Sequence, residues 1–395
     1  MSPLGSLRGV AAITGIGEMK PVRYTEGRTT LEMIAEVARM AAADAGVELR
    51  EIDGLLVDPF NDTPLVIPST VAEYLGLQVT FGELVDLGGA TGAAMVWRAA
   101  AAIAAGQCET CLCVSATPRE ARQTIGWSGA QARPYVSPDA EFEFPYGAIG
   151  ANYAFALIAQ RYAYEYGLTD QQRAKVAVDQ RTNACANPDA IFFGAPITIE
   201  DVLASPMVLE PLHMLEIVMP CAGGAALIVT SAEKARRGKR PSAYLLGAGE
   251  RLTHKSIAAA PSLTSTAVKA AADKAFAMAG VRRSDIKLAS VYDCYTISVL
   301  VTLEDAGFCS KGEAGAFVEA HDLTWKGDFP VNTHGGQLSF GQAGLAGGMS
   351  HVTEAARQVM GIAGDRQIDG CDLAYVNGNG GFMAEQASLV LGRDV

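Results

Sequence analysis

The chain has 395 residues, 49% of them hydrophobic, and it carries 31 Lys and Arg against 43 Asp and Glu, a formal net charge of −12. A chain of this length can bury two hydrophobic cores, and its acidity argues against general nucleic-acid binding. No apolar run approaches the ~20 residues that span a bilayer, and the N-terminus does not resemble a signal peptide. We therefore expect a cytoplasmic protein that does not enter a membrane.

Metal-binding patterns are weak in this sequence. Cys108-x-x-Cys111-x-Cys113 has the spacing of half a zinc site, but no second pair of ligands follows. The alternation around Cys111 favours a buried strand instead. The five histidines have no paired spacing, so we predict no metal site, and the absence of a secretory signal predicts reduced thiols.

Strands and helices alternate in the first part of the chain. Val10 to Gly15 predicts a strand, a helix starts near Thr30 and ends before Gly46, and Ile52 to Asp58 predicts a second strand. A short helix over Val71 to Leu75 follows.

A third strand, Phe81 to Val85, leads into the glycine-rich turn Asp86 to Gly92, a helix through Ala104 and a strand at Cys111 to Ser115. Alternation of this kind predicts a mostly parallel sheet with helices on both faces. A strand that turns directly into a helix exposes N–H groups that can hold a negative charge. No Ser, Cys or Lys lies at the tip of this turn.

The pattern changes between residues 118 and 211, where prolines and aromatics cluster and two helices, Asn152 to Tyr166 and Gln171 to Asn183, are predicted. We interpret this stretch as an inserted lid or interface subdomain on the first sheet.

The first pattern then returns after a strand at Ala225 to Thr230. Ala45-Gly46-Val47, Ile52 and Val57 reappear 234 residues later as Ala279-Gly280-Val281, Ile286 and Val291. A helix over Gly344 to Met360 and a strand over Leu373 to Val376 repeat the turn, helix and strand of the first part. The sequence therefore predicts two copies of one α/β unit, each with a parallel sheet, packed as a pseudo-symmetric pair.

Ligands of open parallel sheets bind beyond the carboxyl ends of the strands, so we expect the site in the loops 86–92, 292–296, 332–344 and 377–381. Tyr292-Asp293-Cys294-Tyr295 ends one predicted strand, and Asn377-Gly378-Asn379-Gly380 ends another. The loop around His334 and Gly341-Gln342 is polar and glycine-rich, which permits close approach to a ligand.

In these motifs the chain resembles the thiolase superfamily, in particular its sterol-carrier-protein branch, and the resemblance covers almost the whole length. It implies an α/β fold with five layers, α-β-α-β-α, built from a half at 1–245, with the insertion at about 118–211, and a half at 246–395. The sequence departs from the thiolase motifs at each reactive position. Gly89 replaces the nucleophilic Cys, Gln342 replaces the His of Gly-His-Pro, Asn377 matches the second Cys, and Tyr292 replaces the His of His-Asp-Cys-Phe.

These departures are similar to those of the cysteine-less retro-aldolases of steroid side-chain degradation. The resemblance implies a lyase that splits a β-hydroxyacyl-CoA, with coenzyme A only as part of the substrate and no covalently bound cofactor. It also implies a homodimer, joined in a heterotetramer by a small OB-fold zinc-ribbon protein that carries the only zinc.

Candidate site residues follow from these loops. We expect acid/base chemistry from Tyr292, whose pKa neighbouring donors can lower below ~10, or from His334. Gln342 and Asn377 can orient substrate or bind an oxyanion. The other residues expected to contact substrate are Gly89, Asp293, Cys294, Gly336, Gly341 and Gly380. Two other functions stay open: a non-catalytic carrier of acyl-CoA or lipid, and an acyltransferase that uses another cysteine such as Cys294.

Overall fold

The computed structural model describes residues 6–60, 65–120 and 141–395. Within these ranges the predicted elements are present, with ends that move by a few residues. The first half has β1 (Ala11–Glu18), α1 (Thr30–Ala45), β2 (Gly54–Val57), α2 (Ile67–Leu75), β3 (Phe81–Leu84), α3 (Thr91–Ala104), β4 (Thr110–Thr117), β7 (Gly223–Ser231) and α8 (Ala232–Arg237). The insertion contributes α5 (Asn152–Tyr166), α6 (Asp170–Cys185), α7 (Ile199–Ala204), β5 (Met207–Leu209) and β6 (Leu212–His213). The second half has β8 (Ala243–Leu252), α9 (Val268–Ala279), β9 (Leu288–Val291), α10 (Thr296–Asp305), α11 (Ala314–Ala320), α12 (Gly336–Ser339), α13 (Gly347–Met360), β10 (Leu373–Gly380) and β11 (Glu385–Gly392).

One sheet of nine strands runs through the molecule in the order β3-β2-β4-β7-β1-β8-β11-β10-β9. The expectation of a separate parallel sheet in each half was wrong. The two halves join where β1 pairs with β8 through Ala12 with Tyr244 and Ile13 with Ala243. Within each half one strand is reversed: β7 runs antiparallel to β4 and β1, and β11 runs antiparallel to β10 and β8. β11 is reversed because a short turn joins it to β10, and only antiparallel strands can be joined in that way.

The internal repeat seen in the sequence is present in the fold. β2 and β9 are 234 residues apart at both ends, and α1 and α9 end 234 residues apart. The reversed strands β7 and β11 occupy matching places in the sheet order, one next to β1 and the other next to β8. Helices α3 and α13 have the same length, and each precedes the strand, β4 or β10, that flanks the reversed strand.

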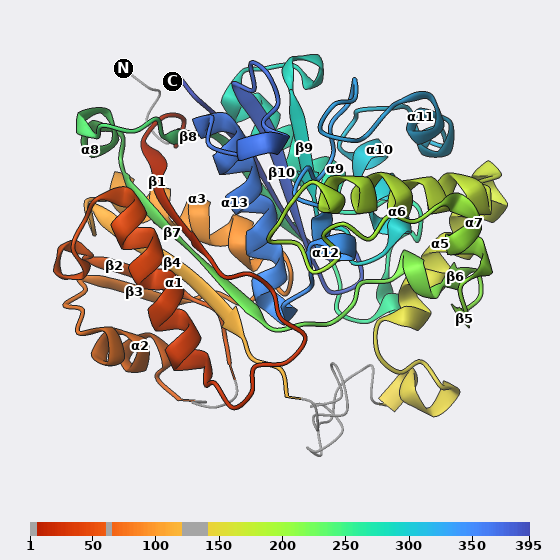
Figure 1. The fold of residues 1–395 in the computed structure, drawn as a ribbon, viewed down its shortest axis with the longest axis horizontal. Coiled ribbons are helices and arrows are strands. Elements are labelled where there is room, and N and C mark those ends of the chain that lie inside the picture. The colour runs from red at the N-terminus through yellow and green to blue at the C-terminus, as the bar shows by residue number, and fades with distance from the viewer. Residues whose placement is uncertain (1–5, 61–64, 121–140) are drawn as a thin grey trace.

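Figure 1 shows the layers of helices and strands, and these follow from the alternation of side chains along the strands. On β11, Leu389 and Leu391 pack in a central core with α3 and α13, whereas Val390 between them faces the outer core of α9. On β7, Leu227 faces the central core and Ile228 faces α1. Helices α3 and α13 therefore lie between the strands of the two halves, with α1 and α9 outside, which is the five-layered α/β arrangement expected.

The insertion packs on the second half of the molecule, although the chain enters it from the first. Phe155 and Tyr162 of α5 and Val176 of α6 belong to the same core as Ile297 and Leu300 of α10. Figure 1 shows α5 and α6, in yellow-green, beside α10 and α12. The insertion thus lies next to the loops that follow β9.

Candidate active site

The four loops selected from the sequence meet beyond the carboxyl ends of β9 and β10. The backbone N–H of Tyr292 donates a hydrogen bond of 2.9 Å to the carbonyl of Asn377. Gly380 lies against the turn before α3, where a β-carbon on Gly380 would be 2.0 Å from the carbonyl oxygen of Leu87. A β-carbon on Gly348, at the start of α13, would be 2.1 Å from the carbonyl oxygen of Gly89. The starts of both central helices therefore border one site.

Gly89, in the turn before α3, faces the ring of Tyr292. A β-carbon at position 89 would lie 2.1 Å from Cε2 and 2.3 Å from Cζ of that ring. The N–H groups of Ala90 and Thr91 donate to the carbonyls of Leu87 and Gly88. These two amides are therefore not free to hold an oxyanion, and the phenol occupies the space of the absent nucleophile.

Tyr292 follows β9 directly and is 7% exposed. Burial raises the pKa of its phenol, and the neighbouring Cys294 and Asp293 raise it further. The side chains of Gln342 and Gln337 act in the opposite direction but do not outweigh burial. The pKa is thus raised and not lowered as the sequence suggested, because removal from water disfavours the phenolate more than the two amides favour it. Tyr292 is a neutral phenol at physiological pH.

Asp293 and Cys294 are buried behind this phenol. The carboxylate of Asp293 is 0% exposed and accepts hydrogen bonds from the backbone N–H of Gln337 at 2.8 Å and of Leu338 at 3.1 Å. The thiol of Cys294 lies 4.0 Å from the hydroxyl of Ser298, and burial raises its pKa. A thiol held in its protonated form is a poor nucleophile.

Several buried polar atoms at the strand ends have no hydrogen-bond partner among the described residues. They are Nδ1 of His334, Oε1 of Gln337, Oδ1 of Asn377 and Nδ2 of Asn379. The amide nitrogen of Asn377 donates to Ser388 at 3.1 Å, and that of Gln342 donates to the carbonyl of Gly344 at 3.0 Å. Unpaired buried polar atoms are rare in proteins, and their concentration here is typical of a binding site for a polar group.

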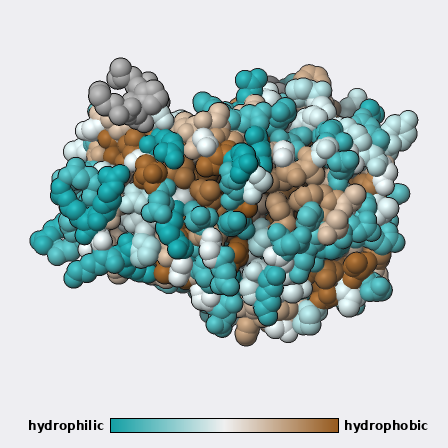
Figure 2. Space-filling model, turned by 90° about the horizontal axis from the view of Figure 1, so that it is seen from above, coloured by the Kyte–Doolittle hydropathy of each residue, from teal (hydrophilic) through white to brown (hydrophobic). Residues whose placement is uncertain are grey.

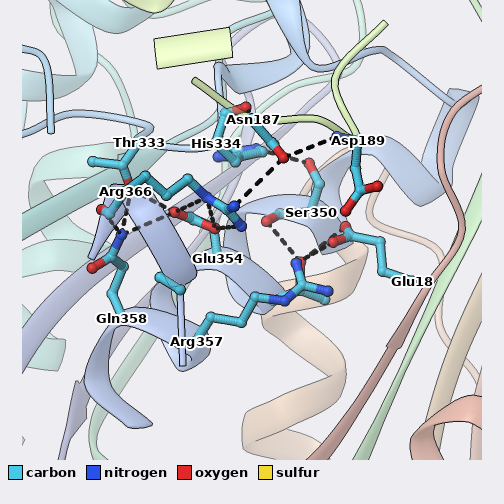
Figure 3. Close-up of polar contacts among 12 residues, drawn as sticks. Glu18, Asn187, Asp189, Thr333, His334, Ser350, Glu354, Arg357, Gln358 and Arg366 are labelled. Carbon is cyan, nitrogen blue, oxygen red and sulfur yellow. Dashed lines mark hydrogen bonds and ion pairs between the residues drawn. The ribbon is translucent and has the colours of Figure 1, made fainter. Parts of the chain in front are cut away.

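His334 lies on the side of α13 that carries a buried ion pair (Figure 3). Its Nε2 is 3.4 Å from the hydroxyl of Ser350, and its carbonyl accepts from Asn187 at 2.9 Å. Thr333 beside it donates to Glu354, which binds Arg366 at 2.9 Å. Burial and the nearby His351 hold the pKa of His334 well below its usual value, so the imidazole is neutral.

His351 was not singled out from the sequence, yet it is the histidine that packs against Tyr292. The two ring centroids are 5.9 Å apart, and the ring of His334 lies 5.3 Å from His351 on another side. Gln337 was also missed. The available signal was the spacing of the two glycines from His351, which follows Gly348 by three residues and Gly347 by four, so that all three border the face of α13 that lies against the site.

The remaining glycines named from the sequence allow close packing. A β-carbon on Gly336 would lie 2.1 Å from Oδ2 of Asp293. Gly341, at a φ of +142°, packs against Pro21 and Cys221, where a β-carbon would lie 2.8 Å from Cβ of Pro21. Gly336 therefore belongs to the wall of the site, whereas Gly341 faces the first half of the chain.

A cavity of about 170 Å³ adjoins the turn that follows Gly380-Gly381. Apolar side chains line most of it, including Ile158 of α5 and Leu263, Phe382 and Met383. Arg251 and His254 provide polar groups at its wall. The cavity is therefore suited to an apolar group attached to a polar one.

Neither a metal centre nor a membrane span occurs in the part of the chain that the structure describes. No group of three or more His, Cys, Asp or Glu side chains there could hold a metal ion. None of the described helices is both long enough and apolar enough to cross a bilayer.

Comparison with known proteins identifies relatives over the full length of the chain. Residues 249–393 match the family described as thiolase C-terminal domain-like. The chain is 33% identical to a steroid side-chain-cleaving aldolase of Thermomonospora curvata, with 98% of this chain and 99% of the relative covered. It is 33% identical to the 17-hydroxy-3-oxo-4-pregnene-20-carboxyl-CoA lyase of Mycobacterium tuberculosis, with 90% and 93% covered. The solved structure of the Ltp2-ChsH2(DUF35) aldolase superposes with a TM-score of 0.88 at 32% identity, covering 98% of this chain and 99% of that one.

Proposed function

The chain belongs to the thiolase superfamily, and we propose that it is a carbon–carbon lyase that cleaves a β-hydroxyacyl-CoA thioester by a retro-aldol reaction. The observation that carries this proposal is the ring of Tyr292 in the space that a side chain at position 89 would need. Thiolase chemistry requires a nucleophile there, whereas retro-aldol cleavage requires only proton transfer and stabilisation of an enolate.

The reaction needs no oxidant and no covalent intermediate. The β-hydroxyl loses its proton, the bond between Cα and Cβ breaks, and a carbonyl forms at Cβ. The electron pair of the broken bond moves to Cα as the thioester enolate, which is then protonated to give the shorter acyl-CoA. Coenzyme A takes part only as a portion of the substrate.

Tyr292 is the residue to which we assign this proton exchange. As the bond between Cα and Cβ breaks, the neutral phenol passes its proton to the electron pair left on Cα, and its oxygen receives the proton of the hydroxyl on the neighbouring Cβ. The side chains of Gln342 and Gln337 both lower the pKa of this phenol, so they favour the negative charge that its oxygen carries during the exchange. His334 stays a second candidate for the base, since its Nδ1 is unpaired.

The apolar part of the acyl group is proposed to lie in the cavity beside Phe382 and Met383. The substrates of the two relatives named above favour a steroid acyl group. Substitution of Phe382→Ala and of Ile158→Ala is expected to raise KM for a steroid thioester by more than tenfold, and to leave kcat for a short branched thioester within twofold.

The test of the function is a set of β-hydroxyacyl-CoA thioesters with steroid, aromatic and branched aliphatic acyl groups. We expect the purified protein to release a ketone or aldehyde and a shorter acyl-CoA from at least one of them, as measured by mass spectrometry. Binding of every thioester without cleavage would support a carrier of acyl-CoA. An acyl adduct on Cys294 would support an acyltransferase.

The assembly that we propose contains two copies of this chain and a small OB-fold zinc-ribbon partner, by analogy with the solved Ltp2-ChsH2(DUF35) aldolase. The edge strand β3 supports the dimer, because its outer side is unpaired in the sheet and its last residue, Leu84, is 44% exposed. On the face shown in Figure 2, hydrophilic side chains divide the apolar ones into smaller patches. Leu84→Lys is expected to give a monomer in analytical ultracentrifugation, whereas an unchanged dimer would exclude this edge.

A cytoplasmic location is also part of the proposal. All eight cysteines are free thiols, and some lie in the same core, which favours a reducing compartment. Fractionation of the source cells would test it.

A further inference from the structure

We propose that Asp293, His351 and Gln337 form a buried positioning unit that holds the phenol of Tyr292 in its reactive orientation. This inference rests on the proposed function, because it gives Tyr292 the central role. The unit joins three elements: the loop after β9, the helix α13 and the short helix α12.

Asp293 fixes the start of α12. Its Oδ1 accepts from the backbone N–H of Gln337 at 2.8 Å, and its Oδ2 accepts from that of Leu338 at 3.1 Å. The carboxylate is 0% exposed and Oδ1 also lies 3.1 Å from Nε2 of His351. A carboxylate with these partners is fully committed to protein groups, so Asp293 is a positioning residue and does not contact substrate.

His351 is held from two sides. Its Nδ1 is 3.4 Å from the hydroxyl of Ser290 in β9, and its Nε2 is 3.1 Å from the side-chain nitrogen of Gln337. The side chain is 0% exposed, and its ring packs against that of Tyr292 at 5.9 Å between centroids. His351 therefore contacts both the phenol ring and the side chain of Gln337.

Gln337 completes the connection to the reactive group. Its backbone is fixed by Asp293, its side-chain nitrogen is in contact with His351, and the same side chain lowers the pKa of the Tyr292 phenol. Gly347 leaves room for this side chain, because a β-carbon there would lie 2.4 Å from Oε1 of Gln337. The amide cannot turn away from Tyr292 without losing the contact to His351.

Stability alone does not account for such a group. A buried carboxylate and its polar partners are often no more stabilising than apolar side chains of the same size, because they lose their hydration. The surrounding core is apolar and well filled, with Val291, Ile297 and Met349 at 0% exposure. Because these three residues lie against Tyr292, they can hold its phenol in one orientation, which apolar side chains could not do.

A double-mutant cycle with Tyr292 separates positioning from general structural damage. Gln337→Met and His351→Leu are each expected to lower kcat about tenfold, the effect of one lost hydrogen bond to the reactive group, with KM changed less than twofold. In a Tyr292→Phe background the same substitutions are expected to change kcat by less than about twofold. Equal losses of kcat in the two backgrounds would contradict the proposal. His351→Gln is expected to recover part of the kcat that His351→Leu loses.

Gln367→Met is the matched control. The amide of Gln367 also makes hydrogen bonds, to the carbonyls of Gln358 and Ile368, but it lies beyond the end of α13. Its substitution is expected to leave kcat unchanged.

A second measurement does not depend on turnover. In protein labelled with 3-fluorotyrosine, the fluorine resonance that disappears in Tyr292→Phe identifies Tyr292. This resonance is expected to shift in Gln337→Met and His351→Leu and to stay in place in Gln367→Met. An unchanged resonance in both would overturn the proposal even if the chain cleaves no thioester, and a shift in a protein without activity would reject the proposed function alone. If His351→Leu does not fold, His351→Gln and Gln337→Met give the same comparison.

Discussion

Gly89 and Tyr292 share one space in this site. A β-carbon at position 89 would lie 2.1 Å from the ring of Tyr292, and the nearest carbonyl, that of Asn379, would be 2.5 Å away. Contacts below 3.0 Å are essentially never made by a real β-carbon. A nucleophilic side chain at position 89 and the ring of Tyr292 in its present place therefore exclude each other.

Restoring the cysteine alone is therefore expected to fail. The side chain of Gly89→Cys would collide with the ring of Tyr292. We expect this variant to lose about 1–3 kcal/mol of stability to overpacking and to show no acyl adduct by intact mass after incubation with acetyl-CoA.

The combined variant Gly89→Cys with Tyr292→Ala is expected to accept an acyl group, because the ring no longer fills the space, although the carbonyl of Asn379 still crowds the new side chain. Gly82→Cys is the control, because its β-carbon would meet nothing closer than 3.7 Å. Acylation of the single variant at unchanged stability would show that Tyr292 does not fill this space.

Glu354 is expected to make stability depend on acid pH. Burial alone would raise its pKa, but the ion pair with Arg366 and the hydrogen bond from Thr333 lower it from 4.5 to about 2. A lowered pKa means that the ionised form stabilises the fold. This contribution is complete above pH 4.5 and disappears as the pH falls through 2.

We expect Glu354→Gln to cost about 3 kcal/mol or more at pH 7, because Arg366 loses its buried partner. The difference from the unmodified protein, measured by urea denaturation, should narrow below pH 4.5. Glu36→Gln, which breaks an exposed pair with Arg28, should have a small effect at all pH values. A constant difference for Glu354→Gln from pH 7 to pH 3 would contradict the assignment.

Asp58 is expected to make the stability of the fold depend on pH in the opposite direction. It follows β2 as Tyr292 follows β9, and burial raises its pKa from 3.8 to about 7, although Ser115 donates a hydrogen bond of 2.6 Å. A raised pKa in an acid means that the folded state favours the protonated form. The stability that Asp58 confers is therefore full below pH 3.8 and is lost as the pH rises through 7.

Asp58→Asn should remove this dependence. Its free energy of unfolding, relative to that of the unmodified protein, is expected to increase between pH 4 and pH 7 and to level off above pH 8. Parallel stability curves for the two proteins over this range would be the contrary result.

The sequence predicted the fold better than the chemistry of the site. The repeat of Ala45-Gly46-Val47 as Ala279-Gly280-Val281 located α1 and α9, because apolar periodicity and helix-ending glycines are local signals. The reversed direction of β7 and β11 was missed, since strand direction depends on how distant segments connect. The four loops of the site were identified from the predicted carboxyl ends of the strands.

The contacts and the protonation states of the side chains in these loops could not be predicted from the sequence. The pKa of Tyr292 depends on burial, and burial of this phenol results from contacts with Gly89 and Gln342, which are far away in the sequence. His351 was missed because it lies inside a helix and not in a loop. Its contact with Asp293 requires α13 to approach the end of β9, which only the assembled fold determines.

The most direct test of the account is the fate of a β-hydroxyacyl-CoA thioester with the unmodified protein, with Tyr292→Phe, and with Tyr244→Phe as a buried tyrosine at the distant end of β8. Products and enzyme mass are followed together by mass spectrometry. The account predicts a carbonyl compound and a shorter acyl-CoA without any acyl-enzyme, and a loss of about 10²-fold or more in kcat for Tyr292→Phe alone. An acyl-enzyme, or full activity in Tyr292→Phe, would contradict it.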